Sequence, residues 1–150
     1  MASSIEMLKI DLVDQLEHMA RARLAAAEAE IAAPFIRKLF ADVPPSDLVP
    51  ERPEELIVAA LSLFEFLKDR PRGSAKVRVY EATSSLRPDQ RHTIIDIVND
   101  DMPFLVDSLR GALERLGVEL RLLLHPVLEI ERDAKSRLRG LRVAEFPAPG

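Results

Sequence analysis

The chain has 150 residues, of which 47% are hydrophobic and 31% are charged, with a net charge of −4 and no cysteine. This composition is typical of a folded protein with a core rather than of a disordered chain. It excludes disulfides, thiolate metal sites and a cysteine nucleophile, and the basic residues form no domain-wide field for nucleic acid.

Targeting and metal signals are weak in this sequence. No uninterrupted apolar run is long enough to span a membrane, and the amphipathic N-terminus is unlike a signal peptide. We therefore expect a cytoplasmic protein that binds neither a membrane nor nucleic acid. His18, His92 and His125 lie far apart on different predicted elements, so we expect no metal site.

The first half of the chain has helical periodicity. Ser3 and Glu6 have the spacing of a capping box, and an apolar stripe follows, made of Ile5, Leu8, Leu12, Leu16 and Met19. Helix-forming residues continue to Ala33, which predicts a long helix, and Pro34 either kinks this helix or starts a new one.

Two further helical segments follow in the first half. A breaker at 43–48 precedes the next boundary, and Ser46 or Asp47 is expected to cap a short turn of helix there. A helical pattern then runs from Pro53 to Arg70, with proline in the first turn, where its missing N–H costs nothing. The chain up to residue 72 therefore reads as a helical subdomain.

The periodicity changes to two after Ser74. The run Lys76–Tyr80 alternates as a half-exposed strand does, and a polar loop follows it. The run Thr93–Val98 is apolar except at Asp96, which predicts a strand with both faces covered or a central strand.

A polar turn, Asn99–Phe104, connects that strand to the next helix. Asp100 and Asp101 are expected to cap the helix, whose apolar residues recur from Leu105 to Leu116 and which Gly117 ends. An alternating run, 118–124, predicts another strand, so the order is strand, turn, helix, strand. The runs 127–132 and 138–146 predict two more strands around a polar turn, before a proline-rich end.

The turn allows a structural and a functional interpretation. It is either the start of an ordinary capped helix or a ligand-binding turn. A helix N-terminus attracts anions such as an amino-acid carboxylate, whereas two aspartates there favour an ammonium group. Spacing alone favours the structural interpretation.

Several of these segments resemble the N-terminal region of the large bacterial NAD-specific glutamate dehydrogenases. The most specific is the run from His92 to Ser108, with its sequence Asn-Asp-Asp-Met-Pro-Phe-Leu-Val-Asp-Ser. The resemblance covers the chain from roughly Arg21 onward and includes the segments Pro34–Phe66, Lys76–Tyr80, His125–Val127 and Arg132–Ala134. In that family the catalytic domain, which deaminates glutamate oxidatively to 2-oxoglutarate with NAD, lies far downstream.

The resemblance implies an ACT-like module, a small βαββαβ unit that often binds amino acids. The expected fold is α+β: a helical subdomain, 1–72, followed by an ACT-like (ferredoxin-like, partial βαββ) antiparallel sheet with one packed helix, 73–150. ACT modules carry an Asp-x-Pro-Gly-Leu turn, and Asp101–Leu105 takes its place here with Phe104 instead of glycine. After Arg137 we find one strand and no second helix, so the module is expected to be truncated at its C-terminus.

Together these observations predict a non-catalytic regulatory or assembly region of an NAD-dependent glutamate dehydrogenase. The five glycines form no nucleotide-binding cluster, so we assign no catalytic, cofactor or metal residue, and NAD belongs to the full-length enzyme. The candidate effector or interface turn consists of Asn99, Asp100, Asp101, Met102, Pro103 and Phe104. The expected partners are the remainder of the dehydrogenase chain, a second copy through a sheet edge or helices, and an amino-acid effector. The alternative is a stand-alone structural ACT-like interaction module without a ligand.

Overall fold

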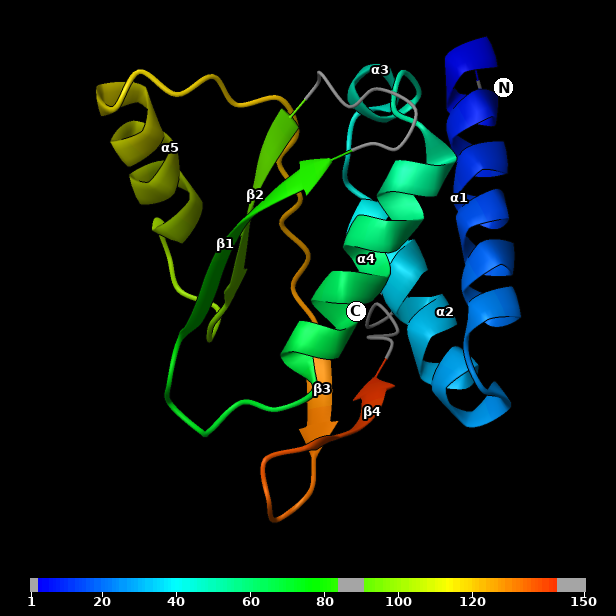
Figure 1. The fold of residues 1–150 in the computed structure, drawn as a ribbon, viewed down its shortest axis with the longest axis vertical. Helices are drawn as coiled ribbons and strands as arrows, with labels where there is room; N and C mark the ends of the chain where they lie inside the picture. Colours follow the sequence, from blue (N-terminus) through cyan, green and yellow to red (C-terminus); the bar gives the residue numbers. More distant parts are fainter. Residues whose placement is uncertain (1–2, 84–90, 143–150) are drawn as a thin grey trace, which may run out of the picture.

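Four helices form the first half of the chain: α1 (Ser4–Arg23), α2 (Ala26–Phe40), α3 (Pro45–Leu48) and α4 (Pro53–Leu67) (Figure 1). The computed structural model describes residues 3–83 and 91–142. At the start of α1 the Ser3 hydroxyl accepts a hydrogen bond from the Glu6 backbone N–H, and the Glu6 carboxylate accepts one from Ser3 N–H. The predicted capping box is therefore confirmed.

The predicted helix that continues to Ala33 is wrong. Leu24 has extended backbone and ends α1, so that α2 folds back alongside it and Pro34 lies inside α2. This arrangement buries Leu16 of α1 and Ile36 of α2 in one core. Burial of apolar side chains outweighs the weak helical preference of the alanine-rich segment, because propensity contributes only tenths of a kcal/mol per residue.

The short helix α3 and the helix α4 differ in how well the sequence predicts them. Pro44 is the N-cap of α3, so the expected cap by Ser46 or Asp47 is wrong, and both residues lie inside the helix. Helix α4 begins at Pro53 as expected and ends at Leu67, before Arg70.

The hydrophobic core lies among the four helices and extends beneath the later part of the chain. The largest fully buried side chains are Leu16, Phe35, Ile36, Phe40, Leu48 and Ile57. Half-buried leucines and isoleucines from the second half pack against them: Leu122, Leu124, Leu128, Ile130, Leu138 and Leu141. Both halves therefore share one core, and the proposed division at residues 72 and 73 stays a prediction.

The strands of the described residues form two separate antiparallel ribbons. Strands β1 (Lys76–Thr83) and β2 (Arg91–Val98) pair with each other, as do β3 (Glu129–Arg132) and β4 (Leu138–Arg142). The helix α5 (Leu105–Arg115) follows β2. Five helices and two small antiparallel sheets confirm the predicted α+β class and agree with an ACT-like domain.

Two details of the predicted sheet are wrong. Strand β2 is not central, because within the described residues it pairs only with β1, and Ile95 is 38% exposed. Residues 118–128 form no strand. Their alternation has another cause, since Leu122, Leu124 and Leu128 pack on the helical core and Arg121 donates two hydrogen bonds, of 3.0 and 3.1 Å, to the Glu51 carboxylate.

Arg78 links the β1–β2 ribbon to α4. The Arg78 guanidinium contacts the Asp96 carboxylate across the ribbon and donates a hydrogen bond of 3.0 Å to the Ser62 hydroxyl of α4. Its central carbon lies 4.5 Å from the centre of the Phe66 ring and 4.7 Å from that of Tyr80. Asp96 is only 8% exposed, so its charge depends on Arg78 for compensation.

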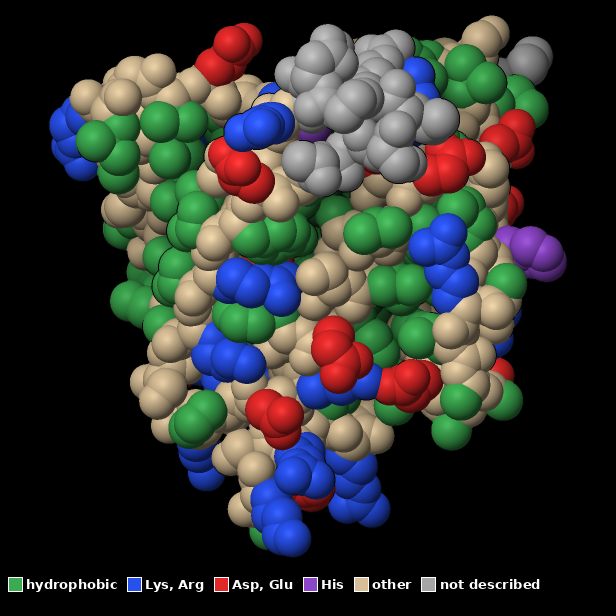
Figure 2. Space-filling view, in the orientation of Figure 1, with side chains coloured by type: hydrophobic (Ala, Val, Ile, Leu, Met, Phe, Trp, Pro, Cys, Tyr) green, Lys and Arg blue, Asp and Glu red, His purple; other side chains and the backbone are tan. Residues whose placement is uncertain are grey.

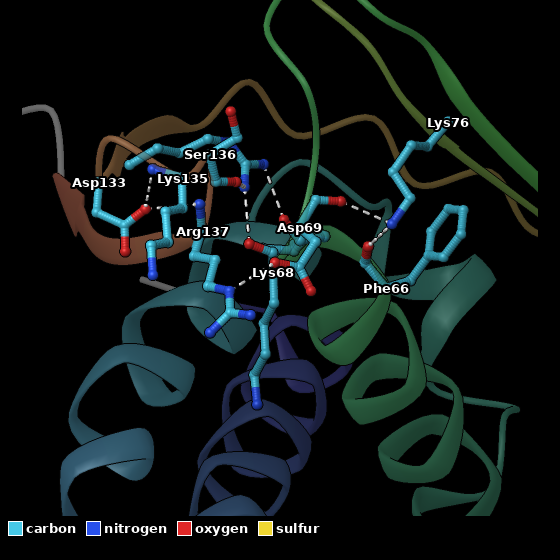
Figure 3. A network of polar contacts seen from close by, with 10 residues as sticks. Phe66, Lys68, Asp69, Lys76, Asp133, Lys135, Ser136 and Arg137 are labelled. Carbon is cyan, nitrogen blue, oxygen red and sulfur yellow. Dashed lines mark hydrogen bonds and ion pairs between the residues drawn. The ribbon is translucent and has the colours of Figure 1, made fainter.

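The β3–β4 ribbon is attached to the C-terminal end of α4 (Figure 3). The Arg132 guanidinium donates to three backbone carbonyls: those of Leu67 and Lys68 at the end of α4 (2.8 and 2.9 Å) and that of Ser136 (3.1 Å). The Leu138 N–H donates to the same Lys68 carbonyl. Burial, and then repulsion from Arg70, lower the pKa of Arg132 from its ordinary value. The unpaired carbonyls of a helix end are thus satisfied by a ribbon far away in the sequence.

Removal of the buried cation should destabilise the fold. We expect Arg78→Met to lower the free energy of unfolding by about 3 kcal/mol, because the Asp96 carboxylate then stays buried without a partner. Arg142→Met is the control, since the Arg142–Glu131 pair is exposed and contributes less than about 1 kcal/mol. Chemical denaturation measures both. Equal losses in the two variants would contradict this role.

The anchor of the β3–β4 ribbon allows a similar test. We expect Arg132→Met to lower the free energy of unfolding by about 2 kcal/mol, because three carbonyls lose a charged donor. Arg139→Met on the exposed side of β4 should cost less than about 0.5 kcal/mol. Faster hydrogen exchange of the Leu138 amide in Arg132→Met, and not in Arg139→Met, would locate the loss at this contact.

Candidate functional site

The candidate turn, residues 99–104, lies at the end of the β1–β2 ribbon where β1 begins and β2 ends (Figure 1). Asn99 is half-buried, whereas residues 100–104 are all exposed. The Asn99 side-chain amide donates to the Met102 sulfur at 3.6 Å, which folds the turn back on itself. The six residues form one turn at the end of the ribbon, and their role as a site stays a prediction.

The two aspartates of the turn have different surroundings. Asp100 accepts a hydrogen bond of 2.8 Å from the Arg70 guanidinium, which is itself mostly buried and also donates to the Ser74 carbonyl. No side chain caps α5, so the expected capping by Asp100 or Asp101 is wrong. Both carboxylates face solvent, but Asp100 has Arg70 as an ion-pair partner, whereas Asp101 has no ion pair within the described residues.

Sequence reasoning missed Arg70 as a neighbour of this turn. The basic residues Lys68, Arg70 and Arg72 were interpreted as favourable charges at a helix C-terminus. Helix α4 ends at Leu67, however, so Arg70 lies beyond it and reaches Asp100. The turn carries two carboxylates and no cation of its own, which is the signal that could have indicated such a partner.

Phe104 has an uncommon backbone conformation. It is the N-cap of α5 with φ +66° and ψ +4°, in the left-handed region, and its side chain is 76% exposed. A side chain in this region costs roughly 1–2 kcal/mol, which glycine avoids. Phe104 therefore occupies, at a conformational cost, the position where the ACT-type turn carries glycine.

Helix α5, which follows the turn, packs only partly against the rest of the chain. It is strongly amphipathic, yet none of its eleven residues, all of which the structure describes, is buried. Leu105, Leu109 and Leu113 are half-buried, whereas Leu116 just beyond the helix is 75% exposed. The turn and its helix are thus only partly enclosed by the rest of the described chain.

A groove with mixed charge lies elsewhere, between α2, the end of α4 and the β3–β4 ribbon. It has a volume of about 320 Å³ and is lined by Glu28, Ile31, Phe64, Lys68, Asp69, Arg137 and Leu138. Burial lowers the pKa of Lys68, but hydrogen bonds to Glu28 and Glu65 outweigh it, so the pKa is raised overall. The charged side chains of the groove pair with one another, so packing between these elements explains the groove without a ligand.

The histidines and carboxylates do not converge within residues 3–83 and 91–142. His18 lies on α1, His92 on β2 and His125 in the segment before β3. No three side chains of the metal-binding types gather in this described part. None of its helices has the length and apolar character needed to cross a membrane.

Comparison with known proteins gives consistent matches. The family model described as "Glutamate dehydrogenase, ACT1 domain" matches residues 35–149. The chain is 34% identical over 147 residues to an NAD-specific glutamate dehydrogenase of Halomonas elongata, which covers 93% of this chain and 9% of that protein. It is 30% identical over 130 residues to an NAD-specific glutamate dehydrogenase of Pseudomonas aeruginosa. This match covers 83% of this chain and 8% of that protein. No solved structure matches.

The lengths in these comparisons differ greatly. The chain spans less than a tenth of the length of the curated relatives it matches. The family match begins at residue 35, inside α2, and includes the ribbon, the candidate turn and α5.

The conformation of Phe104 yields a stability test. We expect Phe104→Gly to raise the free energy of unfolding by about 1 kcal/mol, because glycine adopts the left-handed region without the steric cost. Gly117→Ala, at φ +71° just after α5, should lower it by a similar amount. Denaturant titration measures both. A loss of stability in Phe104→Gly would show that the exposed ring makes contacts that outweigh the strain.

Proposed function

The chain belongs to the glutamate dehydrogenase family that carries the ACT1 domain, and from this premise we propose that it is the N-terminal, non-catalytic regulatory or assembly region of an NAD-dependent glutamate dehydrogenase. The full-length enzyme would convert L-glutamate to 2-oxoglutarate and ammonia in amino-acid catabolism. One observation carries the proposal: a turn of the ACT type joins a ribbon to an amphipathic helix, in a chain that matches less than a tenth of each relative.

The placement of the glycines supports a non-catalytic role for this region. A dinucleotide site needs several glycines close together between a strand and a helix, so that the backbone approaches the phosphates. Here Gly73 and Gly117 have positive φ and serve turns, while Gly111 lies inside α5 and Gly140 inside β4. We therefore propose that NAD binds in another part of the enzyme.

The exposed surfaces support an assembly role, which we propose for a cytoplasmic enzyme. The proposed partners are the remainder of the dehydrogenase chain and a second copy of this chain. A two-stranded ribbon is marginally stable alone and gains stability from further packing. Because β1–β2 has no third strand in the described residues, its edges can pair or its face can be covered.

An amino-acid effector at the candidate turn is the regulatory form of this proposal. Asp101 is exposed and, among the residues that the structure describes, has no cation such as the one beside Asp100, so it would attract the ammonium group of an amino acid. The first N–H groups of α5 would attract its carboxylate. Phe104 opposes this form, because its ring projects where glycine would let a ligand approach.

A second candidate function is a stand-alone structural ACT-like interaction module without a ligand. The strained and exposed Phe104 favours it, since a bulky ring suits a protein contact better than a small-ligand site. The two functions differ in whether an amino acid binds.

We expect the purified chain to form no NADH from glutamate and NAD, because it carries no cluster of glycines for the dinucleotide. Absorbance of NADH measures this outcome, and sustained formation of NADH by the chain alone would contradict the proposal.

Calorimetry with glutamate, aspartate and arginine separates the regulatory form of the proposal from the assembly form. Heat that Asp101→Asn removes and Asp107→Asn preserves would support the regulatory form, whereas no heat would leave the assembly form.

A further inference from the structure

Basic side chains gather at one end of the molecule. The segment 68–76, which follows α4, lies beside the segment 132–139 around the β3–β4 turn, because Asp69 and Arg137 form an isolated β-bridge. These two segments, which we name the basic end, hold eight of the 21 lysines and arginines of the chain and two of its 25 acidic residues. Figure 2 shows Lys and Arg side chains together at the lower tip of the molecule.

The basic end differs in charge from the rest of the chain. Its eight cations and two carboxylates give it a net charge of +6, whereas the whole chain has a net charge of −4, so the remaining residues carry −10. After burial, repulsion from Arg70 is the next cause that lowers the pKa of Arg132, which shows that the cations of this end act on one another. Because such repulsion disfavours the compact state, the gathering of cations needs an explanation in the fold or in a partner.

Contacts within the fold account for four of the eight cations. A helix end leaves backbone carbonyls without partners, and cationic side chains satisfy them here. Other cations of this end are held in ion pairs with carboxylates. The cations held by carbonyls at the end of α4 and by carboxylates are, respectively, Lys76 and Arg132, and Lys68 and Arg70.

The other four cations are all exposed: Arg72, Lys135, Arg137 and Arg139. Arg137 faces Asp69 at 3.6 Å, but both side chains of this pair are about 70% exposed, so water screens their attraction. No ion pair among the described residues involves the other three cations. The second carboxylate of the basic end, Asp133, accepts hydrogen bonds of 2.8 and 3.1 Å from the backbone N–H groups of Lys135 and Arg137. The four exposed cations are therefore available to a partner.

Ordered backbone carries these four side chains. In one turn the Ser74 N–H donates to the Pro71 carbonyl at 3.1 Å, and in the other the Ser136 N–H donates to the Asp133 carbonyl at 3.0 Å. Arg139 lies on β4. A charged group on ordered backbone loses less conformational freedom when it binds, so the basic end is prepared for a contact.

We propose that the basic end binds an acidic segment of protein in the remainder of the dehydrogenase chain. The exposed cations stand on a projecting tip, which suits a macromolecular surface better than a small anion (Figure 2). A nucleic-acid duplex carries a charge about every 1.7 Å and would extend along residues whose net charge is −10, which would repel it. A short acidic segment meets the tip alone, and opposite charges across a contact fix its orientation.

The identity of the partner rests on the proposed function, whereas the chemistry of the partner rests on the basic end. The chain spans less than a tenth of the curated relatives it matches, so the proposed enzyme has a long further polypeptide that could supply the acidic segment. The test below uses neither NAD nor glutamate and does not involve the candidate turn, 99–104. The two proposals can therefore fail separately.

Fluorescence anisotropy of a labelled decaglutamate peptide with the 150-residue chain tests the proposal. At about 0.1 M salt, charges more than about 10 Å apart are largely screened, so the measurement reports local contacts. We expect binding whose dissociation constant rises at least about tenfold when Lys135→Glu and Arg139→Glu are combined, because two attractions become repulsions. The matched control combines Arg110→Glu and Arg115→Glu, which change the net charge equally on the distant helix α5 and should alter the dissociation constant less than about twofold.

Three results would overturn the proposal. One is a wild-type chain without measurable affinity for the peptide. Another is an equal loss in the two double variants, which would indicate a general effect of net charge. The third is a labelled DNA duplex that binds as tightly as the peptide, which would indicate a surface for nucleic acid. Circular dichroism checks that each variant is folded, and if the first double variant is not, Lys135→Gln with Arg139→Gln provides the same comparison with an expected change of about threefold.

Discussion

The ion pair between Arg78 and Asp96 decides which face of the β1–β2 ribbon meets the helices. A buried carboxylate is tolerated only with a cation beside it, and Arg78 provides this cation while it lies against the rings of Phe66 and Tyr80. Because side chains alternate along a strand, fixing this pair on the helical side directs the neighbouring valines outward. The side of the ribbon that meets the helices thus carries this pair together with Val98, which packs on the core, and the valines lie on the other side.

This orientation also places the turn and α5 on the outside. The turn is tied back through Arg70 and Asp100, whereas α5 and the ring of Phe104 face away from the helical core. The same region matches the glutamate dehydrogenase ACT1 domain, and the chain is a small part of the relatives it matches. The exposed turn and helix are the surfaces on which the proposed assembly role rests.

Local signals predicted much of the fold, and long-range contacts account for the errors. The capping box of Ser3 and the proline at the start of α4 act within a few residues, so the sequence predicts them well. The break at Leu24 and the loss of a strand at 118–128 depend on packing against distant helices. For the candidate site, the sequence indicates residues 99–104 as a turn whose role stays a prediction. It gives no sign of Arg70, because the partner of Arg70 lies thirty positions away. The left-handed conformation of Phe104 has no sequence signal of its own.

The orientation of the ribbon can be measured directly by nuclear Overhauser contacts in solution. The account predicts contacts from the Phe66 ring protons to the side-chain methylenes of Arg78 and none from that ring to the methyl groups of Val79. The two residues are adjacent on β1, so a ribbon with the opposite face inward would exchange the two results. Contacts between Phe66 and the Val79 methyl groups, with none to Arg78, would contradict the account.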